Sequence, residues 1–178
     1  NELTNTVNGT ENDSVPISLT SNTSVVKLVD GLTLTLEADK TYWKDGNLKY
    51  TITLDNATDV NYENVTLTDV LDTTYISFVT DSVKINDVEA TSGEYEYNDG
   101  TNTLTINLAS VDAQNKTIIT FSVKKINDFF ILINIVLATL SDGRENESNI
   151  VKTLSPINRW HTVINYGCGV QYWNINQN

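Results

Sequence analysis

The chain has 178 residues, of which 39% are hydrophobic and 19% are charged, and its formal net charge is −12. This length and hydrophobic content allow one large β-sandwich, or one and a half small ones. An excess of carboxylates repels phosphate backbones and anionic lipid headgroups, so nucleic acid and membrane surfaces are disfavoured as partners.

Residues 1–29 come before the main series of predicted strands and have two interpretations. They form either an extended N-terminal arm or the tail hairpin of a preceding repeat. Residues 3–7 (LTNTV) resemble residues 132–136 (LINIV), and residues 21–27 (SNTSVVK) resemble residues 148–152 (SNIVK). Such self-similarity indicates modules in tandem. The alternative is a chance similarity between Asn- and Thr-rich strands.

An N-terminal arm would have the composition of an assembly strand. Its apolar residues Val25, Val26 and Leu28 are placed to fill pockets if the arm adds to the exposed sheet edge of a neighbouring subunit. Such a contact is head-to-tail and propagates into a fibre unless it closes into a ring. Copies of the chain itself, or related surface repeats, are therefore the expected partners.

Residues 30–156 are predicted to form one β-sandwich domain. Apolar and polar residues alternate in many short runs rich in Thr, Val, Ile and Tyr, as expected of antiparallel strands with one face buried. Turn sequences rich in Asp, Asn and Gly separate these runs at short spacing. The predicted strands are residues 31–37, 48–54, 65–70, 75–78, 82–85, 94–97, 104–108 and 118–123.

The longest apolar run is residues 129–140 (FFILINIVLATL), with Asn134 in its middle. It is shorter than the roughly 20 residues that a membrane-spanning helix needs. Its continuous hydrophobicity predicts a strand buried on both faces.

Residues 157–178 are predicted to form a C-terminal β-hairpin around a Gly-Cys-Gly turn. Three interpretations of this hairpin stay open. It covers a sheet edge of its own domain, or it packs on a neighbouring subunit, or it presents an aromatic platform to sugar rings. Its aromatic residues, the candidate interface, are Trp160, Tyr166, Tyr172 and Trp173.

Cys168 is the only cysteine and His161 the only histidine. A single cysteine excludes an internal disulfide and a cysteine-based zinc site, and leaves Cys168 as a candidate intermolecular cross-link. A Cys–His catalytic pair would need an orienting third group, which the sequence does not show. The chain has no Met, so we expect a processed or trimmed form of a longer secreted product.

No other motif predicts an enzyme. The sequence shows no glycine-rich phosphate loop, and its many carboxylates lie in turns and on alternating strand faces. We therefore expect no catalytic residue and no cofactor. Acidic residues assigned to turns could supply oxygen ligands for calcium, although solvated turn carboxylates are the simpler interpretation. These residues are Asp69, Asp72, Asp99 and Asp142.

Seven Asn-x-Ser/Thr sequons make the chain a candidate glycoprotein, although a composition so rich in Asn, Thr and Ser produces several by chance. The candidate sites are Asn8, Asn12, Asn22, Asn56, Asn64, Asn115 and Asn146.

From Leu32 to Thr153 the pattern resembles the repeat domain of bacterial and archaeal surface proteins called domain of unknown function 11. Each motif is weak alone, and their order and spacing carry the resemblance. The motifs are residues 34–39 (LTLEAD), 45–56 (DGNLKYTITLDN), 64–71 (NVTLTDVL), 76–79 (ISFV), 82–85 (SVKI), 104–108 (LTINL), 119–123 (ITFSV) and 147–151 (ESNIV).

The resemblance implies an immunoglobulin-like sandwich in tandem arrays on surface-anchored, layer-forming, adhesive or spore-appendage proteins, with no catalytic residues. Many members of this family carry Lys where this sequence has Leu36, so an intramolecular Lys–Asn isopeptide bond is less expected here. Lys27, Lys40 and Asn149 are the nearest candidates for such a bond.

Together these features predict an all-β, immunoglobulin-like antiparallel sandwich with extra N-terminal strands and a C-terminal hairpin. The expected function is that of a structural module of an extracellular fibre, spore appendage or surface layer, on the cell or spore surface, assembling by β-strand addition. The alternative is an adhesin module that binds a glycan or a host or matrix protein. A fold shared with other proteins does not by itself establish either function.

Overall fold

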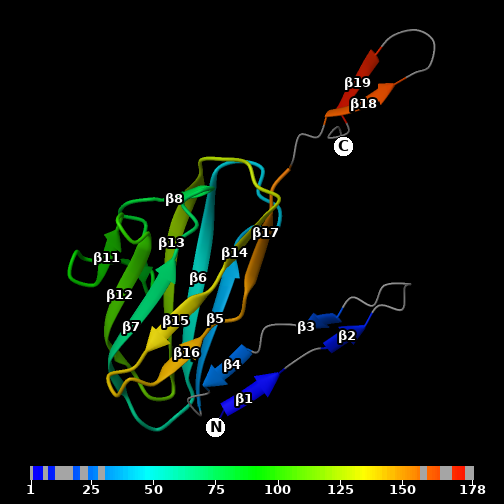
Figure 1. Cartoon of the computed structure of the whole chain (residues 1–178). Helices are drawn as coiled ribbons and strands as arrows, with labels where there is room; N and C mark the ends of the chain where they lie inside the picture. The colour runs from blue at the N-terminus through cyan, green and yellow to red at the C-terminus, as the bar shows by residue number, and fades with distance from the viewer. Residues whose placement is uncertain are drawn as a thin grey trace.

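The computed structural model describes residues 31–156 in full and, outside them, the backbone of six short strands (Figure 1). The flanking strands are β1 (Glu2–Asn5), β2 (Asn8–Thr10), β3 (Ser18–Thr20), β4 (Ser24–Lys27), β18 (Trp160–Ile164) and β19 (Val170–Asn174). The described residues contain no helix with the length and hydrophobicity to cross a membrane.

Residues 31–156 form an immunoglobulin-like antiparallel β-sandwich, which confirms the predicted fold class. All eight predicted runs contain a strand. The strands are β5 (Leu32–Ala38), β6 (Asn47–Asn56), β7 (Tyr62–Val70), β8 (Ile76–Phe78), β9 (Lys84–Ile85), β10 (Val88–Glu89), β11 (Tyr95–Asn98), β12 (Thr103–Val111), β13 (Asn115–Lys125), β14 (Ile131–Asn134), β15 (Val136–Thr139), β16 (Glu145–Glu147) and β17 (Val151–Leu154).

Two sheets pack face to face. The first has the strand order β10-β9-β13-β6-β5, with β8 also paired to β13, and the second has the order β11-β12-β7-β15-β16. β14 and β17 form a separate two-stranded ribbon beside β5 (Figure 1). The long hairpin from β12 to β13 leaves one sheet and enters the other, as strands of sandwiches commonly do.

The inner faces of the two sheets supply a single core, as period-two alternation requires. Leu32 and Leu36 of β5 point inward while the Thr residues between them point to solvent. Tyr50 of β6 and Phe121 of β13 are register partners whose ring centroids lie 5.2 Å apart, and both are fully buried. These aromatic rings fill the centre of the sandwich.

The apolar run 129–140 is not a strand buried on both faces, so that prediction was wrong. It breaks at Ile135 into β14 and β15, which belong to different sheet systems. In β14, Leu132 and Asn134 are buried, while Ile131 and Ile133 face solvent. Because Ile131 and Ile133 are apolar although they face solvent, the hydrophobic pattern of the sequence did not reveal the alternating burial of β14.

The N-terminal strands repeat the pairing of the closing strands of the sandwich. β14 and β17 form an outer pair around β15 and β16, and β1 and β4 form an outer pair around β2 and β3. Adding 129 to the residue numbers of β1 and β2 reaches β14 and β15, and adding 127 to those of β3 and β4 gives β16 and β17. The partners then agree, since Glu2↔Lys27 corresponds to Ile131↔Leu154.

β18 and β19 pair antiparallel, with Ile164 opposite Val170. The predicted C-terminal hairpin is therefore present as a strand pair. The side chains of its aromatic residues lie outside the described residues, and so does Cys168.

Candidate functional site

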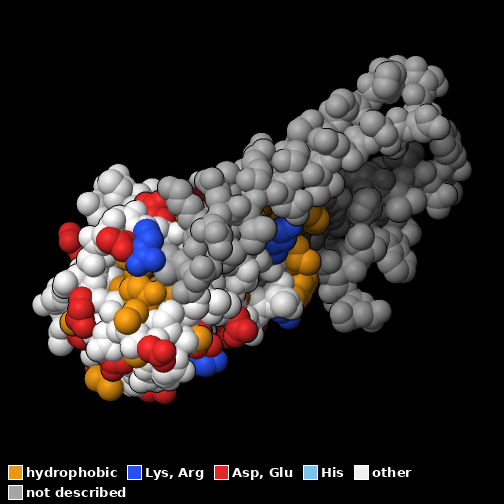
Figure 2. Space-filling model, turned by 90° about the horizontal axis from the view of Figure 1, so that it is seen from below, with side chains coloured by type: hydrophobic (Ala, Val, Ile, Leu, Met, Phe, Trp, Pro, Cys, Tyr) orange, Lys and Arg blue, Asp and Glu red, His pale blue; other side chains and the backbone are white. Residues whose placement is uncertain are grey.

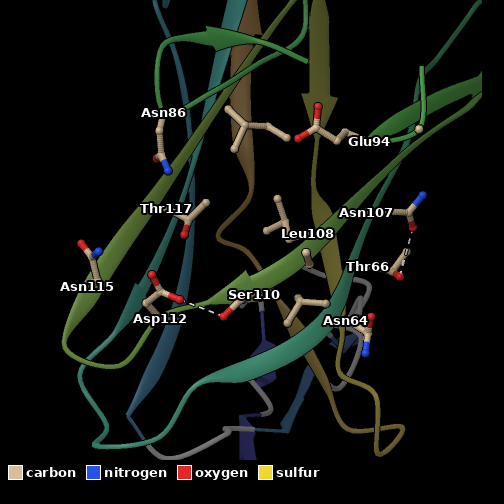
Figure 3. A pocket seen from close by; sticks show the side chains of 14 residues that line it. Asn64, Thr66, Asn86, Glu94, Asn107, Leu108, Ser110, Asp112, Asn115 and Thr117 are labelled. Atoms are coloured by element: carbon tan, nitrogen blue, oxygen red, sulfur yellow. Dashed lines mark hydrogen bonds between the residues drawn. The ribbon is translucent and has the colours of Figure 1, made fainter. Parts of the chain in front are cut away.

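A polar cleft of about 590 Å³ opens between the two sheets on the side of the β12–β13 hairpin (Figure 3). Asn64 and Thr66 of β7, Ser110 of β12 and Thr117 of β13 are among its lining residues. Amides and hydroxyls thus dominate the lining, which suits a ligand bound by hydrogen bonds.

The cleft contains two carboxylates, and each is held by its own neighbours. Glu94 accepts hydrogen bonds of 2.8 Å from the amide and the hydroxyl of Thr91, and these bonds lower the pKa of Glu94. Asp112 accepts a 2.8 Å bond from Ser110 Oγ. Figure 3 places Glu94 and Asp112 at opposite ends of the cleft, so they do not form an acid–base pair there.

A second depression, the aromatic groove, has a volume of about 660 Å³ and lies over β8 and β11. The rings of Phe78 and Tyr97 stack with centroids 4.8 Å apart, and Tyr95 lies 6.3 Å from Phe78. All three rings are half-buried. Tyr95 Oη donates a 3.2 Å bond to Asp81, which holds that ring in place.

The aromatic groove has acidic and no basic residues in its lining. Glu96 and Asp99 are exposed at its rim, and burial, followed by the charge of Asp99, raises the pKa of Tyr97. Half-exposed rings beside carboxylates attract sugar rings or cationic side chains. The sequence prediction placed an aromatic platform only in the C-terminal hairpin and missed this groove, because its rings come from two separate short strands.

A carboxylate is buried in the sandwich core. Asp69 of β7 is 2% exposed, and Asn134 Nδ2 donates a 2.9 Å bond to its Oδ2. Its Oδ1 has no hydrogen-bond partner among the described residues. Asp69 was expected in a turn as a calcium ligand, and the structure corrects this, because the residue lies within a strand and faces inward.

Burial disfavours the charged form of Asp69 and raises its pKa to about 7, with the Asn134 bond opposing the change. Burial also raises the pKa of Tyr50, and the negative charge of Asp69 adds to that effect. Within residues 31–156 no group of three or more His, Cys, Asp or Glu side chains is arranged to hold a metal ion.

Two asparagine side chains cap the outer edge of β5. Asn149 binds the backbone of Leu36 through two bonds of 2.9 Å, accepting from its N–H and donating to its C=O. Asn146 Nδ2 donates a 2.8 Å bond to the Leu32 carbonyl. These side chains take the place of a neighbouring strand, because edge backbone groups otherwise remain open to pairing.

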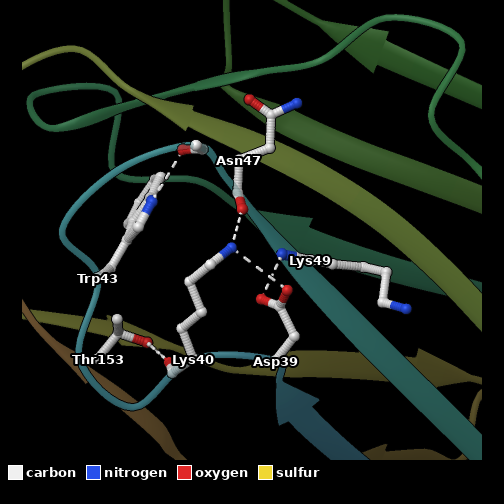
Figure 4. A network of polar contacts seen from close by, with 7 residues as sticks. Asp39, Lys40, Trp43, Asn47, Lys49 and Thr153 are labelled. Atoms are coloured by element: carbon white, nitrogen blue, oxygen red, sulfur yellow. Dashed lines mark hydrogen bonds and ion pairs between the residues drawn. The ribbon is translucent and has the colours of Figure 1, made fainter.

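The candidates for an isopeptide bond have separate partners. The Lys40 ammonium contacts the Asp39 carboxylate and the Asn47 carbonyl (Figure 4), whereas Asn149 is occupied by the Leu36 backbone. Lys27 lies in β4, where only the backbone is described. The Lys40 and Asn149 side chains are therefore not brought together.

The network of Figure 4 closes one end of the sandwich. Trp43 is fully buried, its indole N–H donates a 2.9 Å bond to the Gly46 carbonyl, and its backbone N–H donates a 2.7 Å bond to Leu154 of β17. The Trp43 ring also lies 6.0 Å from that of Phe129. This loop ties the β14–β17 ribbon to the end of β5.

The outer face of the ribbon, here called the ribbon face, is exposed and mainly apolar, with Lys152 opposite Ile133. Ile131 and Leu154 are cross-strand partners that are 37% and 43% exposed, and Ile133 is 54% exposed. Several exposed apolar side chains on one part of a domain surface commonly mark a contact site. The ribbon face consists of Ile131, Ile133, Lys152 and Leu154 of the two strands, with exposed Tyr42 bridged to Leu154 and exposed Phe130 and Ile150 directly before β14 and β17.

Figure 2 shows another face of the molecule. Acidic side chains are spread over the described surface there, with few basic ones and with small hydrophobic patches between them. This distribution agrees with the net charge of −12 and does not form a basic surface for nucleic acid.

The predicted glycosylation sites divide by burial. Asn64 and Asn115 are exposed, and both line the polar cleft. Asn56 is fully buried and donates to three carbonyls, and Asn146 is 6% exposed, so neither amide can carry a glycan in the folded domain. Asn8 lies in β2, with only its backbone described, and Asn12 and Asn22 lie outside the described residues.

The other predicted site residues fall in the flanking segments. Val25 and Val26 lie in β4, and Leu28 is outside the described residues. Trp160 lies in β18, Tyr172 and Trp173 lie in β19, and Tyr166 is outside the described residues. The contacts of these side chains are therefore still predictions.

Solved structures of bacterial surface proteins share this fold. BcpA, the major pilin subunit of Bacillus cereus, matches with a TM-score of 0.51 and 14% identity over 83% of this chain and 51% of that chain. The full-length major pilin SpaD of Corynebacterium diphtheriae matches with a TM-score of 0.52 and 23% identity over 69% of this chain and 35% of that chain.

A third match is the C-terminal domain of the Streptococcus pyogenes antigen I/II-family protein AspA, with a TM-score of 0.50 and 18% identity over 77% of this chain and 50% of that chain. The chain thus spans about half the length, or less, of the structures it matches. At these identities the matches establish the fold alone.

No protein-family model and no curated protein sequence matches the chain. The resemblance to domain of unknown function 11 therefore stays a prediction, while the immunoglobulin-like architecture is established by the structure.

Proposed function

We propose that this chain is a structural module of an extracellular surface fibre, spore appendage or surface layer, and that it assembles with copies of itself or related repeats by β-strand addition. The observation that carries this proposal is the exposed ribbon face on β14 and β17. Contact of its apolar register pair Ile131↔Leu154 with water is unfavourable, and burial of the pair against another subunit is favourable.

Strand addition needs an open strand edge, and β14 offers one. Among the described strands β14 pairs only with β17, so its other edge carries backbone groups available to a further strand. The edge of β5 is less accessible because Asn149 and Asn146 occupy it. A strand added to β14 would cover Ile131 and Ile133 while its backbone supplied hydrogen bonds.

The N-terminal strands are the proposed donors. β4 contains Val25 and Val26, and a donor strand of one copy that pairs with β14 of the next copy makes a head-to-tail contact. The fold shared with BcpA and SpaD, two major pilin subunits, supports a place on the cell surface in a fibre.

The role of the ribbon face in self-association can be tested by placing there a charged pair that the chain already has in its N-terminal strands. Ile131→Glu with Leu154→Lys reproduces the Glu2↔Lys27 pair found at the corresponding positions of β1 and β4. We expect this double variant to keep the unfolding midpoint and to lose self-association, measured by size-exclusion chromatography and electron microscopy of the full chain.

The matched control places the same charges elsewhere, as Ile118→Glu with Val70→Lys, at residues that are 42% and 67% exposed. The control should assemble as the parent does. Deletion of residues 1–28 should abolish filaments as well. Unchanged filaments after that deletion, or equal assembly by both double variants, would contradict assembly by strand addition.

The aromatic groove favours a second function, that of an adhesin module binding a glycan or a matrix protein. Phe78, Tyr95 and Tyr97 present half-exposed rings beside Glu96 and Asp99, as a carbohydrate platform does. Binding of the full chain to a glycan array and to immobilised collagen, compared with Tyr97→Ala, tests this function. Equal binding by parent and variant on every ligand would refute it.

A further inference from the structure

We infer that residues 2–27 are the closing unit of a second sandwich, and that their partner is a sandwich body equivalent to residues 31–129. This inference rests on the proposed function for tandem or fibrous assembly and adds a second partner to it. Strand addition to β14 joins one copy of the chain to another, whereas the whole N-terminal unit closes a sandwich body that precedes it. It begins from the matching register of β1–β4 and β14–β17, in which both outer and inner pairs correspond strand by strand.

The two units are identical at several of the positions that are buried in the second one. Leu3 corresponds to Leu132, which is 2% exposed, and Val7 corresponds to Val136, which is fully buried. Side chains that are buried in one copy have been kept in the other, as expected if both units close the same kind of core.

The polar identities have specific tasks in the second unit. Asn5 corresponds to Asn134, whose amide binds the buried Asp69. By sequence, the pair Ser21-Asn22 corresponds to Ser148-Asn149. Ser148 Oγ accepts from the Val136 amide at 3.0 Å, and Asn149 caps Leu36 of the first strand. A body that matches the N-terminal unit should therefore contain a first strand with an open edge and a buried carboxylate.

The two units differ where the second one faces solvent. Ile131, Ile133 and Leu154 of the ribbon face correspond to Glu2, Thr4 and Lys27. Part of the buried face is thus common to both units, whereas buried Ala138, Asn146 and Thr153 correspond to Gly9, Leu19 and Val26. The apolar outer residues Ile131, Ile133 and Leu154 are specific to the second unit, although exposed Lys152 corresponds to Val25. Burial in a sandwich core explains the residues that the two units share. It does not explain the apolar residues of the ribbon face, which are exposed in the folded domain.

A second copy of this chain offers the open edge of β14 for strand addition, but it does not offer an unclosed sandwich body. Its core is already closed by its own Leu132 and Val136, and its β5 edge is already capped by Asn149. The N-terminal unit therefore needs a body that lacks its own closing strands, such as the repeat that would lie directly upstream in a tandem array.

The test adds such a body to the full chain. Residues 29–129 are joined ahead of residue 1, so that Asn1 takes the position of Phe130 in the added copy. We expect two folded sandwiches, with the amides of β1 and β4 protected from hydrogen exchange. Leu3→Ala should lower the unfolding midpoint of the added sandwich by roughly 10 °C and leave the other unchanged, and Leu132→Ala in the original sandwich should do the reverse.

The control joins residues 29–156 ahead of residue 1, so that the added body has its own closing strands. Leu3→Ala should change neither midpoint in this control or in the unfused chain. The inference is overturned if the control folds while the shorter fusion leaves the added body unfolded, or if Leu3→Ala has no effect in the shorter fusion. Filament formation by the unfused chain tests the proposed function separately.

Discussion

At the residue scale, Asp69 is the most unusual group in the sandwich. A carboxyl group inside a core is more stable in its neutral form, because burial removes the water that stabilises the charge. Its pKa of about 7 in the folded state lies above the value of about 3.9 for an unfolded chain. The folded state therefore binds the proton more tightly than the unfolded state does.

This difference sets the sign of a pH dependence. The contribution of Asp69 is fully present below about pH 4 and is lost as the pH rises towards 7. We expect the free energy of unfolding to decrease over this window, as measured by urea titration at several pH values. Asp69→Asn keeps an acceptor for Asn134 and should flatten this dependence.

The matched control is Asp55→Asn, which removes an exposed carboxylate that pairs with Lys116 at 2.9 Å. It should keep the parent's dependence between pH 4 and 7. If Asp69→Asn and the parent lose stability equally across this window, Asp69 does not carry the linked proton.

At the element scale, the edge of β5 shows how side chains can replace a strand. Asn149 makes two hydrogen bonds to Leu36, and removing them leaves a partly buried N–H and C=O without partners. We expect Asn149→Ala to lower the free energy of unfolding by about 1–3 kcal/mol. It should also increase self-association, because an exposed edge pairs with other chains.

Denaturant titration and light scattering measure the two effects. Asn107→Ala, which removes an exposed asparagine of β12, is the control and should change neither quantity by much. A loss of stability without added association would show that the exposed edge of β5 is protected in another way.

The β14–β17 ribbon illustrates a different rule for elements. Hydrophobic residues of a strand commonly indicate its buried face, but here Ile131 and Ile133 occupy the solvent face. The equivalent positions of β1 are Glu2 and Thr4, so strand formation does not require apolar residues there. The physical consequence is a surface whose burial in an assembly is favourable.

At the scale of the whole molecule, the single cysteine links the chain's redox state to its assembly. Cys168 has no partner of its own kind within the chain, so oxidation can join it only to another molecule. We expect size-exclusion chromatography without reductant to show a covalent dimer that reverts with reductant. Cys168→Ser should remove that dimer and leave the strand-mediated assembly intact. An identical elution profile in both conditions would exclude the cross-link.

Local pattern determined much of this architecture. Period-two alternation in runs such as Leu32–Ala38 and Asn47–Asn56 is a property of neighbouring residues, and it sufficed to predict the strands of eight runs, the sandwich class and the terminal hairpin. It did not predict the division of residues 129–140 into β14 and β15. The aromatic groove and the polar cleft were not predicted, because their residues come from strands far apart in the sequence.

The tertiary structure alone decided which side chains meet across the sandwich. Asp69 and Asn134 are 65 positions apart, and Leu36 and Asn149 are 113 apart, so no local periodicity relates them. The same holds for burial, because whether Ile133 faces the core or solvent depends on what packs against its strand. The sequence by itself determined most of the strands and their alternating pattern. The packing of distant strands decided the buried carboxyl group, the capped edge of β5 and the exposed ribbon face.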